Sequence, residues 1–350
     1  MIDSPAPMST ASTMSAVEMP KGLRYLFGTW SGRILLLNTL VFLFICFYTH
    51  SIMLPDSAAL TLLGAKDTVA IAQGEFWRFL TPIFLHIGVV HFAFNSYFLY
   101  AVGYQLERLL GAPWFIAIYL LAGIAGNLAS AAFSVTMSAG ASSSLFGLLG
   151  AGLFLERTIG THIKAQTGRR PKQRAYLMTV AVNLGFGLLM PFIDNSAHLG
   201  GLTAGLILTA AMVNLRPNQL QPRRPLVGYS LLIILGLTAA GLGYYSMTPH
   251  LVVHRLEVAG DRASDPTEQA YLYSQALALS PDANAIILKR IRIFFSIKRF
   301  SPAFNDVRVL ISRGEQLKEL GTLADDLDLQ GHQAESWELR RMLAHANQSI

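Results

Sequence analysis

Residues 197–205 read Ala-His-Leu-Gly-Gly-Leu-Thr-Ala-Gly, an apolar and small-residue stretch that contains one ionisable side chain. Apolar neighbours extend it to Val213, and a helix needs about 20 such residues to cross the hydrocarbon core of a bilayer. Gly201 and Gly205 form a small-xxx-small pair, which lets two helix backbones approach closely within a membrane. The stretch therefore predicts a membrane helix packed tightly on a neighbour, with His198 in its first turn.

The whole chain has the composition of a membrane protein. Of its 350 residues, 52% are hydrophobic and 14% are charged, whereas soluble domains carry roughly 25% charged residues. We count seven apolar runs and predict a membrane helix in each, at residues 34–52, 89–105, 114–133, 142–155, 176–192, 197–213 and 226–245. This pattern predicts an all-α, polytopic membrane protein.

The basic residues between these runs indicate the orientation of the chain. They gather before the first run, between the fourth and fifth, and between the sixth and seventh: Lys21, Arg24, Arg33, Arg157, Lys164, Arg169, Arg170, Lys172, Arg174, Arg216, Arg223 and Arg224. The alternate loops at residues 133–141 and 193–196 contain no Lys or Arg. Because basic loops favour the cytoplasm, the N-terminus is predicted to be cytoplasmic and the C-terminal region extracytoplasmic, in a bacterial-type inner membrane. The net charge of +6 is then a topology signal, and no nucleic-acid partner is expected.

The chain divides into four predicted parts. Residues 1–20, rich in Ser, Met, Ala and Pro, are predicted to be a disordered leader, residues 21–215 a core of six spans, and residues 216–250 a linker with the seventh span. Residues 251–350 are predicted to form a soluble helical domain, because charged residues return there at the density of a soluble protein. Cys46, the one cysteine, lies in the first apolar run, so disulfides within the chain are excluded.

The C-terminal part contains amphipathic helical patterns. Residues 269–282 close with Ser-Pro-Asp and resemble the second helix of a tetratricopeptide repeat. A second amphipathic stretch covers residues 286–300, after which Ser301-Pro302 precede a third at residues 304–311. Repeat hairpins present a groove to a peptide, so one interpretation gives this domain a protein partner; the other is a small helical cap that packs on itself.

Four polar side chains lie within the apolar runs at one predicted level of the membrane. Ser142 begins the fourth span at its extracytoplasmic end, His198 lies in the first turn of the sixth, and His91 and Asn95 lie near the outer start of the second. Polar groups inside a membrane are costly and are functional candidates by default. Together they supply a hydroxyl, an imidazole that accepts its proton, and donors for oxyanion charge, which acyl transfer requires.

These residues and their neighbours resemble the rhomboid family of intramembrane serine proteases. The matching segments follow the family order between residues 70 and 215: Trp77-Arg78, His86, His91-Phe-Ala-Phe-Asn95, Glu107-Arg108 with Gly111, Gly140-Ala141-Ser142, and Ala197-His198-Leu-Gly-Gly201 with Gly205. The resemblance implies a rhomboid-like six-helix core, to which the seventh span is added. It places Trp77-Arg78 in the first extracytoplasmic loop and Glu107 in a structural polar network.

By that resemblance, the chain is an intramembrane serine endopeptidase that cleaves single-span membrane proteins near the extracytoplasmic face. Ser142 is the nucleophile and His198 its general base, with no acidic third member. Asn95 and His91, with the Ser142 backbone N–H, stabilise the oxyanion. Three more residues support the site: Gly140, Phe146, which stacks on the His198 ring, and Gly201. Neither a cofactor nor a metal is expected.

One position departs from the family pattern. The family usually has Gly directly after the nucleophile, whereas this chain has Ser143. A side chain there could crowd the oxyanion pocket, and Ser143 and Ser144 also offer rival hydroxyls. Ser142 is preferred because it alone follows Gly140-Ala141 in the family spacing and stands four residues before Phe146.

Other classes of protein lack their defining residues here. A zinc protease would show an HExxH helix, and an aspartyl intramembrane protease would need two carboxylates inside the spans. A secondary transporter would show paired repeats or broken helices, which we do not find. The remaining alternative is a catalytically inactive rhomboid-like protein that binds membrane clients; such proteins have lost the dyad, whereas Ser142 and His198 are both present. Transmembrane protein substrates and the lipid bilayer are the expected partners.

Overall fold

The computed structural model describes residues 20–167, 173–190, 193–215 and 224–349. Nearly all of the predicted leader at residues 1–20 lies outside this part of the chain, as do several basic residues used for the topology: Arg169, Arg170, Lys172, Arg216 and Arg223. The described residues form helices joined by short connections, with an isolated β-bridge between Lys66 and Ser138. The prediction of an all-α, polytopic membrane protein is confirmed.

Each of the seven predicted apolar runs corresponds to helical structure in the described chain. The helices are α2 (Trp30–Thr49), the continuous stretch α5 (Val89–Phe98), η3 (Leu99–Gly103) and α6 (Tyr104–Leu110), then α7 (Ala112–Phe133), α8 (Ser142–Thr167), α9 (Gln173–Leu189), α10 (Asn195–Leu215) and α11 (Pro225–Met247). Within the described ranges, α2, α7, α10 and α11 are long and apolar enough to cross a membrane. Helix α8 continues past its predicted end at residue 155, because Glu156 and Arg157 end the apolar run without ending the helix.

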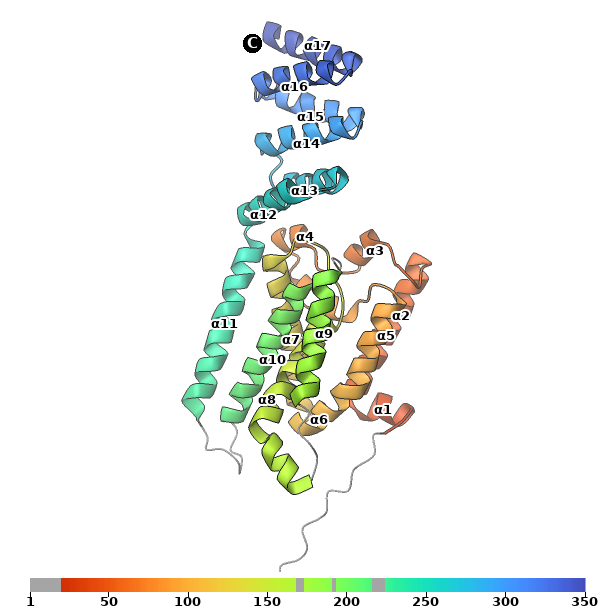
Figure 1. Cartoon of the computed structure of the whole chain (residues 1–350), viewed down its shortest axis with the longest axis vertical. Helices are drawn as coiled ribbons and strands as arrows, with labels where there is room; N and C mark the ends of the chain where they lie inside the picture. The colour runs from red at the N-terminus through yellow and green to blue at the C-terminus, as the bar shows by residue number, and fades with distance from the viewer. Residues whose placement is uncertain (1–19, 168–172, 191–192, 216–223, 350) are drawn as a thin grey trace, which may run out of the picture.

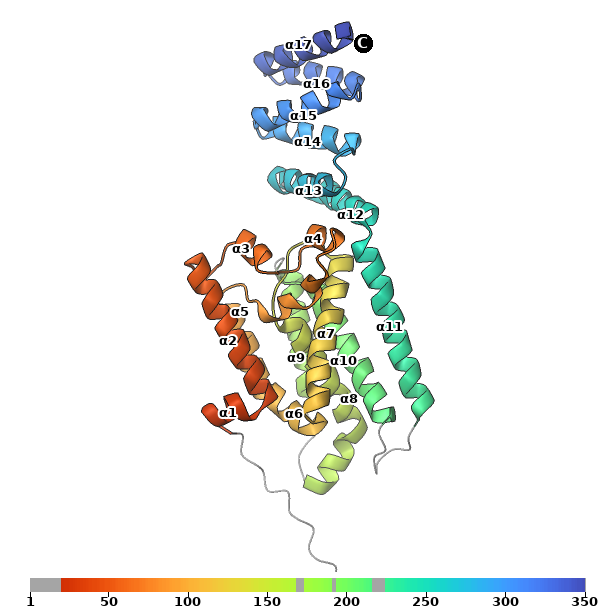
Figure 2. The same ribbon diagram turned by 180° about the vertical axis from the view of Figure 1, so that it is seen from behind.

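Short helices close the two ends of this bundle. They are α1 (Leu23–Gly28), α3 (Ser57–Leu62), α4 (Thr68–Ala72), η1 (Phe76–Phe79) and η2 (Thr81–Phe84). Figures 1 and 2 show α3 and α4 at the end from which the C-terminal helices project, and α1 and α6 at the opposite end. The bundle therefore has two distinct ends. The loop before Ser142, the first residue of α8, pairs through Ser138 with Lys66, which lies between α3 and α4.

The outer helices expose large apolar side chains. Phe47 of α2 is 77% exposed, and Leu226 and Leu237 of α11 are 81% and 70% exposed. Contiguous apolar surface of this extent is unfavourable in water, whereas in a bilayer it meets lipid tails and all helical backbone groups stay hydrogen-bonded. The outward-facing surface thus agrees with a multi-pass membrane protein.

Helix α10 packs closely on both α7 and α8 through small residues. A Cβ added at Gly205 would collide with the carbonyl oxygen of Gly147 on α8, and one added at Gly201 would collide with the carbonyl oxygen of Ser143. On the other side, a Cβ at Gly126 of α7 would lie 2.6 Å from the Ala197 carbonyl oxygen. The predicted close approach of the glycine stripe is confirmed, and it sets the distance between the helices that carry Ser142 and His198.

Two buried basic residues order the loops at the α3–α4 end. The Lys66 side chain is fully buried, and its Nζ donates to the carbonyl oxygens of Ser134, at 3.0 Å, and Thr136. Arg78 donates from Nη1 to the carbonyl oxygens of Thr61 and Ala65 and pairs through Nε with a neighbouring carboxylate. These bonds satisfy carbonyl groups that irregular backbone would otherwise leave unpaired, so the loops that precede α5 and α8 have a defined course.

At the opposite end, Glu107 joins α6 to the start of α2. Its carboxylate accepts the backbone N–H groups of Trp30 at 2.8 Å and Ser31 at 2.9 Å, and the Ser31 hydroxyl at 2.8 Å. The first N–H groups of a helix have no partner within the helix, and a negative charge is favoured there. Glu107 is thus part of a structural polar network.

The C-terminal helices pack in successive pairs that stack away from the bundle (Figures 1 and 2). The helices are α12 (Pro249–Arg262), α13 (Pro266–Leu279), α14 (Asn284–Ser296), α15 (Phe300–Ser312), α16 (Leu317–Leu329) and α17 (Gln333–Ser349). Helix α13 ends before Ser280-Pro281, as predicted. Ser301-Pro302 lie inside the first turn of α15 rather than before a helix, because Pro is tolerated where an N–H has no helical partner.

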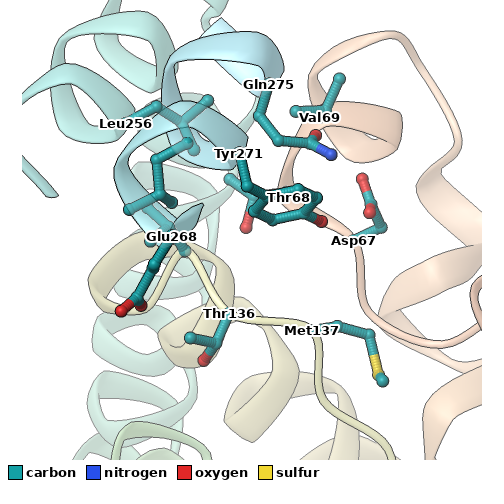
Figure 3. Close-up of a pocket in the computed structure, with 11 residues that line it drawn as sticks. Asp67, Thr68, Val69, Thr136, Met137, Leu256, Glu268, Tyr271 and Gln275 are labelled. Carbon is teal, nitrogen blue, oxygen red and sulfur yellow. The ribbon is translucent and has the colours of Figure 1, made fainter. Parts of the chain in front are cut away.

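The hairpin α12–α13 sits on the loops of the bundle. Val69 of α4 is 8% exposed and belongs to the same apolar core as Leu256 of α12 and Leu272 of α13. Arg255 of α12 donates to the carbonyl oxygens of Ala131 and Ala132, at the end of α7. A cavity of about 70 Å³ lies at this junction (Figure 3). It is lined by Asp67, Thr68, Val69, Val135, Thr136, Met137, Leu256, Glu268, Tyr271, Leu272 and Gln275. The C-terminal helices therefore contact the loop that leads to α8.

Candidate active site

The start of α8 positions Ser142. Gly140, two residues earlier, has a φ of +149°, and a Cβ added to it would lie 2.5 Å from Cε1 of His91. Only glycine tolerates both the backbone conformation and the neighbouring ring. The chain then turns into α8 at Ser142, whose side chain is partly exposed. Its hydroxyl therefore lies at the end of the helix where another group can reach it.

His198 lies opposite this hydroxyl. Its Nε2 is 3.0 Å from the Ser142 Oγ, a normal hydrogen-bond distance. The Phe146 ring, one turn after Ser142, stacks on the imidazole with centroids 4.2 Å apart and planes 9° from parallel. His198 is 7% exposed. The hydrogen bond joins the first turns of α8 and α10, and the stacked ring holds the imidazole in one plane.

The two neighbouring serines face elsewhere. The Ser143 Cβ lies against Gly126 of α7, and the Ser144 Oγ lies against Gly123 of the same helix. Both hydroxyls are buried and have no hydrogen-bond partner among the described residues. Of the three hydroxyls, the one on Ser142 contacts His198. The side chain that replaces the family's usual glycine thus packs on α7.

The first turns of α5 carry two further polar groups, His91 and Asn95. The His91 ring lies against Gly140, and its Nδ1 accepts the Ile87 N–H at 3.4 Å. Asn95 lies one turn later on the same face of the helix. It is 7% exposed, and its Nδ2 donor has no partner within the described chain. A buried amide donor without a partner is free to bind an oxyanion.

His86 lies behind His91. It is fully buried, its ring centroid is 5.5 Å from that of His91, and neither of its ring nitrogens has a hydrogen-bond partner in the described ranges. Within the described residues its ring lies beside those of His91 and Phe92.

Sequence reasoning missed Asp194. This residue precedes α10, and its Oδ1 accepts the Ala197 N–H at 3.0 Å. Asp is one of the residues preferred directly before a helix, where its side chain accepts a backbone N–H from the first turn. A polar group inside an apolar run stands out in the sequence, whereas Asp194 lies just outside such a run.

A metal site is not part of this arrangement in the described residues. No group of three or more His, Cys, Asp or Glu side chains there could hold a metal ion. A hydroxyl bonded to an imidazole suits nucleophilic acyl transfer.

Comparison with known proteins identifies the family. A model of the Rhomboid domain matches residues 73–215. The chain is 37% identical over 247 residues to rhomboid protease GluP of Bacillus subtilis (strain 168), covering 67% of this chain and 45% of that protein. It is 38% identical over 156 residues to RHOMBOID-like protein 6, mitochondrial, of Arabidopsis thaliana, covering 44% of this chain and 50% of that protein. RHOMBOID-like protein 1 of the same plant is 33% identical over 200 residues, covering 57% of this chain and 48% of that protein.

These matches cover about half the length of the relatives. The segment that matches the domain model includes Ser142 and His198. The segment that matches the domain model contains α7, α8 and α10, the three helices whose close packing brings the two side chains together. Sequence motif, helix arrangement and similarity agree, and the chain belongs to the rhomboid family.

Proposed function

We propose that this protein is an intramembrane serine endopeptidase that cuts single-span membrane proteins near the extracytoplasmic face. The observation that carries the proposal is the 3.0 Å contact between the Ser142 Oγ and His198 Nε2 at one end of the helical bundle. Membership of a family that includes a named rhomboid protease supports it. A serine hydroxyl is a weak nucleophile unless a base accepts its proton, and the imidazole is placed to do so.

The acylation step uses the groups in this order. The Ser142 Oγ attacks the scissile carbonyl carbon while His198 Nε2 takes the hydroxyl proton. The carbonyl oxygen becomes an oxyanion, which accepts hydrogen bonds from the Asn95 Nδ2, the Ser142 backbone N–H and His91. When the intermediate collapses, the C–N bond breaks and the imidazolium gives its proton to the leaving amine.

Deacylation repeats the sequence with water. His198 removes a proton from a water molecule, the hydroxide attacks the acyl carbon, and the Ser142 Oγ leaves as it regains a proton. This cycle needs water at the end of α8, where Ser142 is partly exposed. No cofactor enters either step.

The expected substrate is a membrane helix that can unwind. A peptide bond inside an intact helix is shielded by its own backbone hydrogen bonds, and exposed backbone groups are costly in lipid. A single span with Gly or other helix-destabilising residues near the outer interface meets this requirement. The bilayer and such spans are the proposed partners.

We place the dyad end of the bundle outside the cytoplasm. The opposite end carries Arg24, Arg33, Arg157, Arg174 and Arg224 within the described helices and their caps, and basic residues favour the cytoplasmic side. The N-terminus is then cytoplasmic and α12–α17 extracytoplasmic, in a bacterial inner membrane.

Cysteine labelling tests this orientation in a Cys46→Ser background. Thr322→Cys should react with an impermeant maleimide in intact spheroplasts, whereas Arg157→Cys should react only after lysis. The reverse pattern would invert the topology.

Labelling with a fluorophosphonate tests the activity without a known substrate. The folded wild type should form an adduct that mass spectrometry locates on Ser142. His198→Ala should form the adduct at least about 10²-fold more slowly, because a general base contributes about 10²–10⁴-fold to such a step. A folded wild type that forms no adduct would instead favour a rhomboid-like protein that binds membrane clients without cleaving them.

A further inference from the structure

Asp194 sets the start of the helix that carries His198. Its Oδ1 accepts the Ala197 N–H at 3.0 Å, and its backbone carbonyl oxygen accepts the His198 N–H at 3.2 Å. The carboxylate thus satisfies one of the helix N–H groups that lack a partner and places a negative charge at the positive end of α10. Because His198 lies in the first turn, its position depends on where and how this turn begins.

The second carboxylate oxygen ties the same turn to α7. The Asp194 Oδ2 accepts a hydrogen bond from the Ser130 hydroxyl, whose side chain is fully buried. The Ser130 Oγ is also 3.4 Å from the Ser138 Oγ. Since Ser130 donates to the carboxylate, Ser138 is left to donate to Ser130. The start of α10 and the loop before α8 therefore share one buried serine.

Ser138 belongs to the loop that ends in Ser142. Its backbone pairs with Lys66, with N···O distances of 2.8 and 3.2 Å. Burial lowers the pKa of the Lys66 ammonium to about 8, and the negative charges of Asp194 and Asp67 oppose that shift. Asp194 therefore lies within electrostatic range of the side chain that holds this loop, as well as within range of the His198 ring.

We propose that Asp194 is a positioning residue for the Ser142–His198 dyad, an inference that rests on the proposed function. It fixes the first turn of α10, and through Ser130 it fixes that turn relative to the nucleophile loop. It is not a third member of a catalytic triad, because within the described residues the His198 Nδ1 has no hydrogen-bond partner. The carboxylate acts through the helix start and not through a bond to the imidazole.

Kinetics of cleavage of a single-span substrate in liposomes test this role. The purified proteins to compare are wild type, Asp194→Ala, Asp194→Asn and Ser130→Ala. Asp194→Ala should lose at least about tenfold in kcat with KM within about twofold, because a displacement of about 1 Å in a catalytic group can cost on the order of 10²-fold. Asp194→Asn should recover most of that loss, since Asn is as good an N-cap as Asp. Ser130→Ala should lower kcat less than Asp194→Ala.

Asp265→Ala is the matched control. Asp265 caps α13 through the backbone N–H groups of Thr267 and Glu268, as Asp194 caps α10, but lies in the C-terminal helices. It should leave kcat unchanged even where it lowers the melting temperature. Three results would each overturn the inference. They are equal kcat losses in Asp194→Ala and Asp265→Ala, a wild-type kcat in a folded Asp194→Ala, and no recovery of kcat in Asp194→Asn.

A double-mutant cycle keeps the inference separate from the proposed function. If wild type cleaves nothing, the proposed function fails, and the melting temperatures of Asp194→Ala, Ser130→Ala and the double variant still test the link. Melting-temperature losses that fail to add would support the buried connection between α10 and α7, since groups in one hydrogen-bond network are coupled. Strictly additive losses would overturn it.

Discussion

Three consecutive serines begin α8, and their surroundings differ at the scale of single atoms. Ser142 is partly exposed and bonded to His198, whereas Ser143 and Ser144 are buried against glycines of α7. Small residues at Gly123 and Gly126 make room for the two buried side chains. The serine after the proposed nucleophile is thus accommodated by α7.

Asn95 supplies the clearest prediction for a single residue. Asn95→Ala should lower kcat by about 10²–10³-fold with little change in KM, because loss of one oxyanion donor acts on the transition state. Steady-state kinetics on a single-span substrate measure both constants. Asn183→Ala, which removes an exposed amide on α9, is the control and should behave as wild type. An Asn95→Ala variant with the kcat of wild type would remove Asn95 from the proposed mechanism.

The sequence predicts the candidate site residues where a polar side chain interrupts an apolar run. His198, Ser142, His91 and Asn95 stand out on that criterion, and the structure brings the first two into contact. Ser130 could not be found in this way, because a serine within a membrane helix usually bonds to its own backbone. Its partner Asp194 lies 64 positions further along the chain, and such a pairing becomes visible only when α7 and α10 are placed together.

Helix α10 is the element on which the site depends. It lies between α7 and α8, and glycines on both sides let the backbones touch. Periodicity and composition were enough to predict this packing, because small residues four apart have few other uses in a membrane helix. Helix ends were harder to predict: α8 runs on through charged residues that end its apolar run, since hydropathy reports the membrane boundary and not the helix boundary.

Gly205→Val tests the packing of α10 on α8. The added side chain would collide with the Gly147 carbonyl oxygen, and overpacking of this kind costs about 1–3 kcal/mol. The variant should melt at a lower temperature and cleave more slowly. Gly236→Val introduces the same side chain on α11, where nothing lies within 4 Å of the added Cβ, and should leave both properties unchanged. Equal behaviour of the two variants would contradict the packing account.

At the scale of the whole molecule, the C-terminal helices and the loops of the bundle form one connected structure. Val69, Arg255 and the loop at residues 134–137 join them. Sequence composition predicted a soluble helical part, but this junction depends on contacts between segments far apart in the chain. The predicted division into four parts and the likeness to a tetratricopeptide repeat stay predictions.

The junction affects how the role of the C-terminal helices can be tested. Deleting them would expose Val69 and leave the carbonyl oxygens of Ala131 and Ala132 without Arg255. A lost activity would then not show that these helices bind a protein partner. Val69→Asp is a smaller change: a buried carboxylate without a partner is costly, and the junction should open. Hydrogen exchange at residues 134–141 should then increase, whereas Val309→Asp, on the surface of α15, should have no such effect. Unchanged exchange in Val69→Asp would show that the loop does not depend on the junction.

The central claim concerns the pair Ser142 and His198, and cleavage of a model single-span substrate in liposomes tests it most directly. Purified wild type, Ser142→Ala, Ser143→Ala and His198→Ala are compared under the same conditions. We predict that Ser142→Ala and His198→Ala abolish cleavage and that Ser143→Ala retains it, because the Ser142 hydroxyl is the one bonded to the imidazole. Cleavage that persists in Ser142→Ala and is lost in Ser143→Ala would contradict the account.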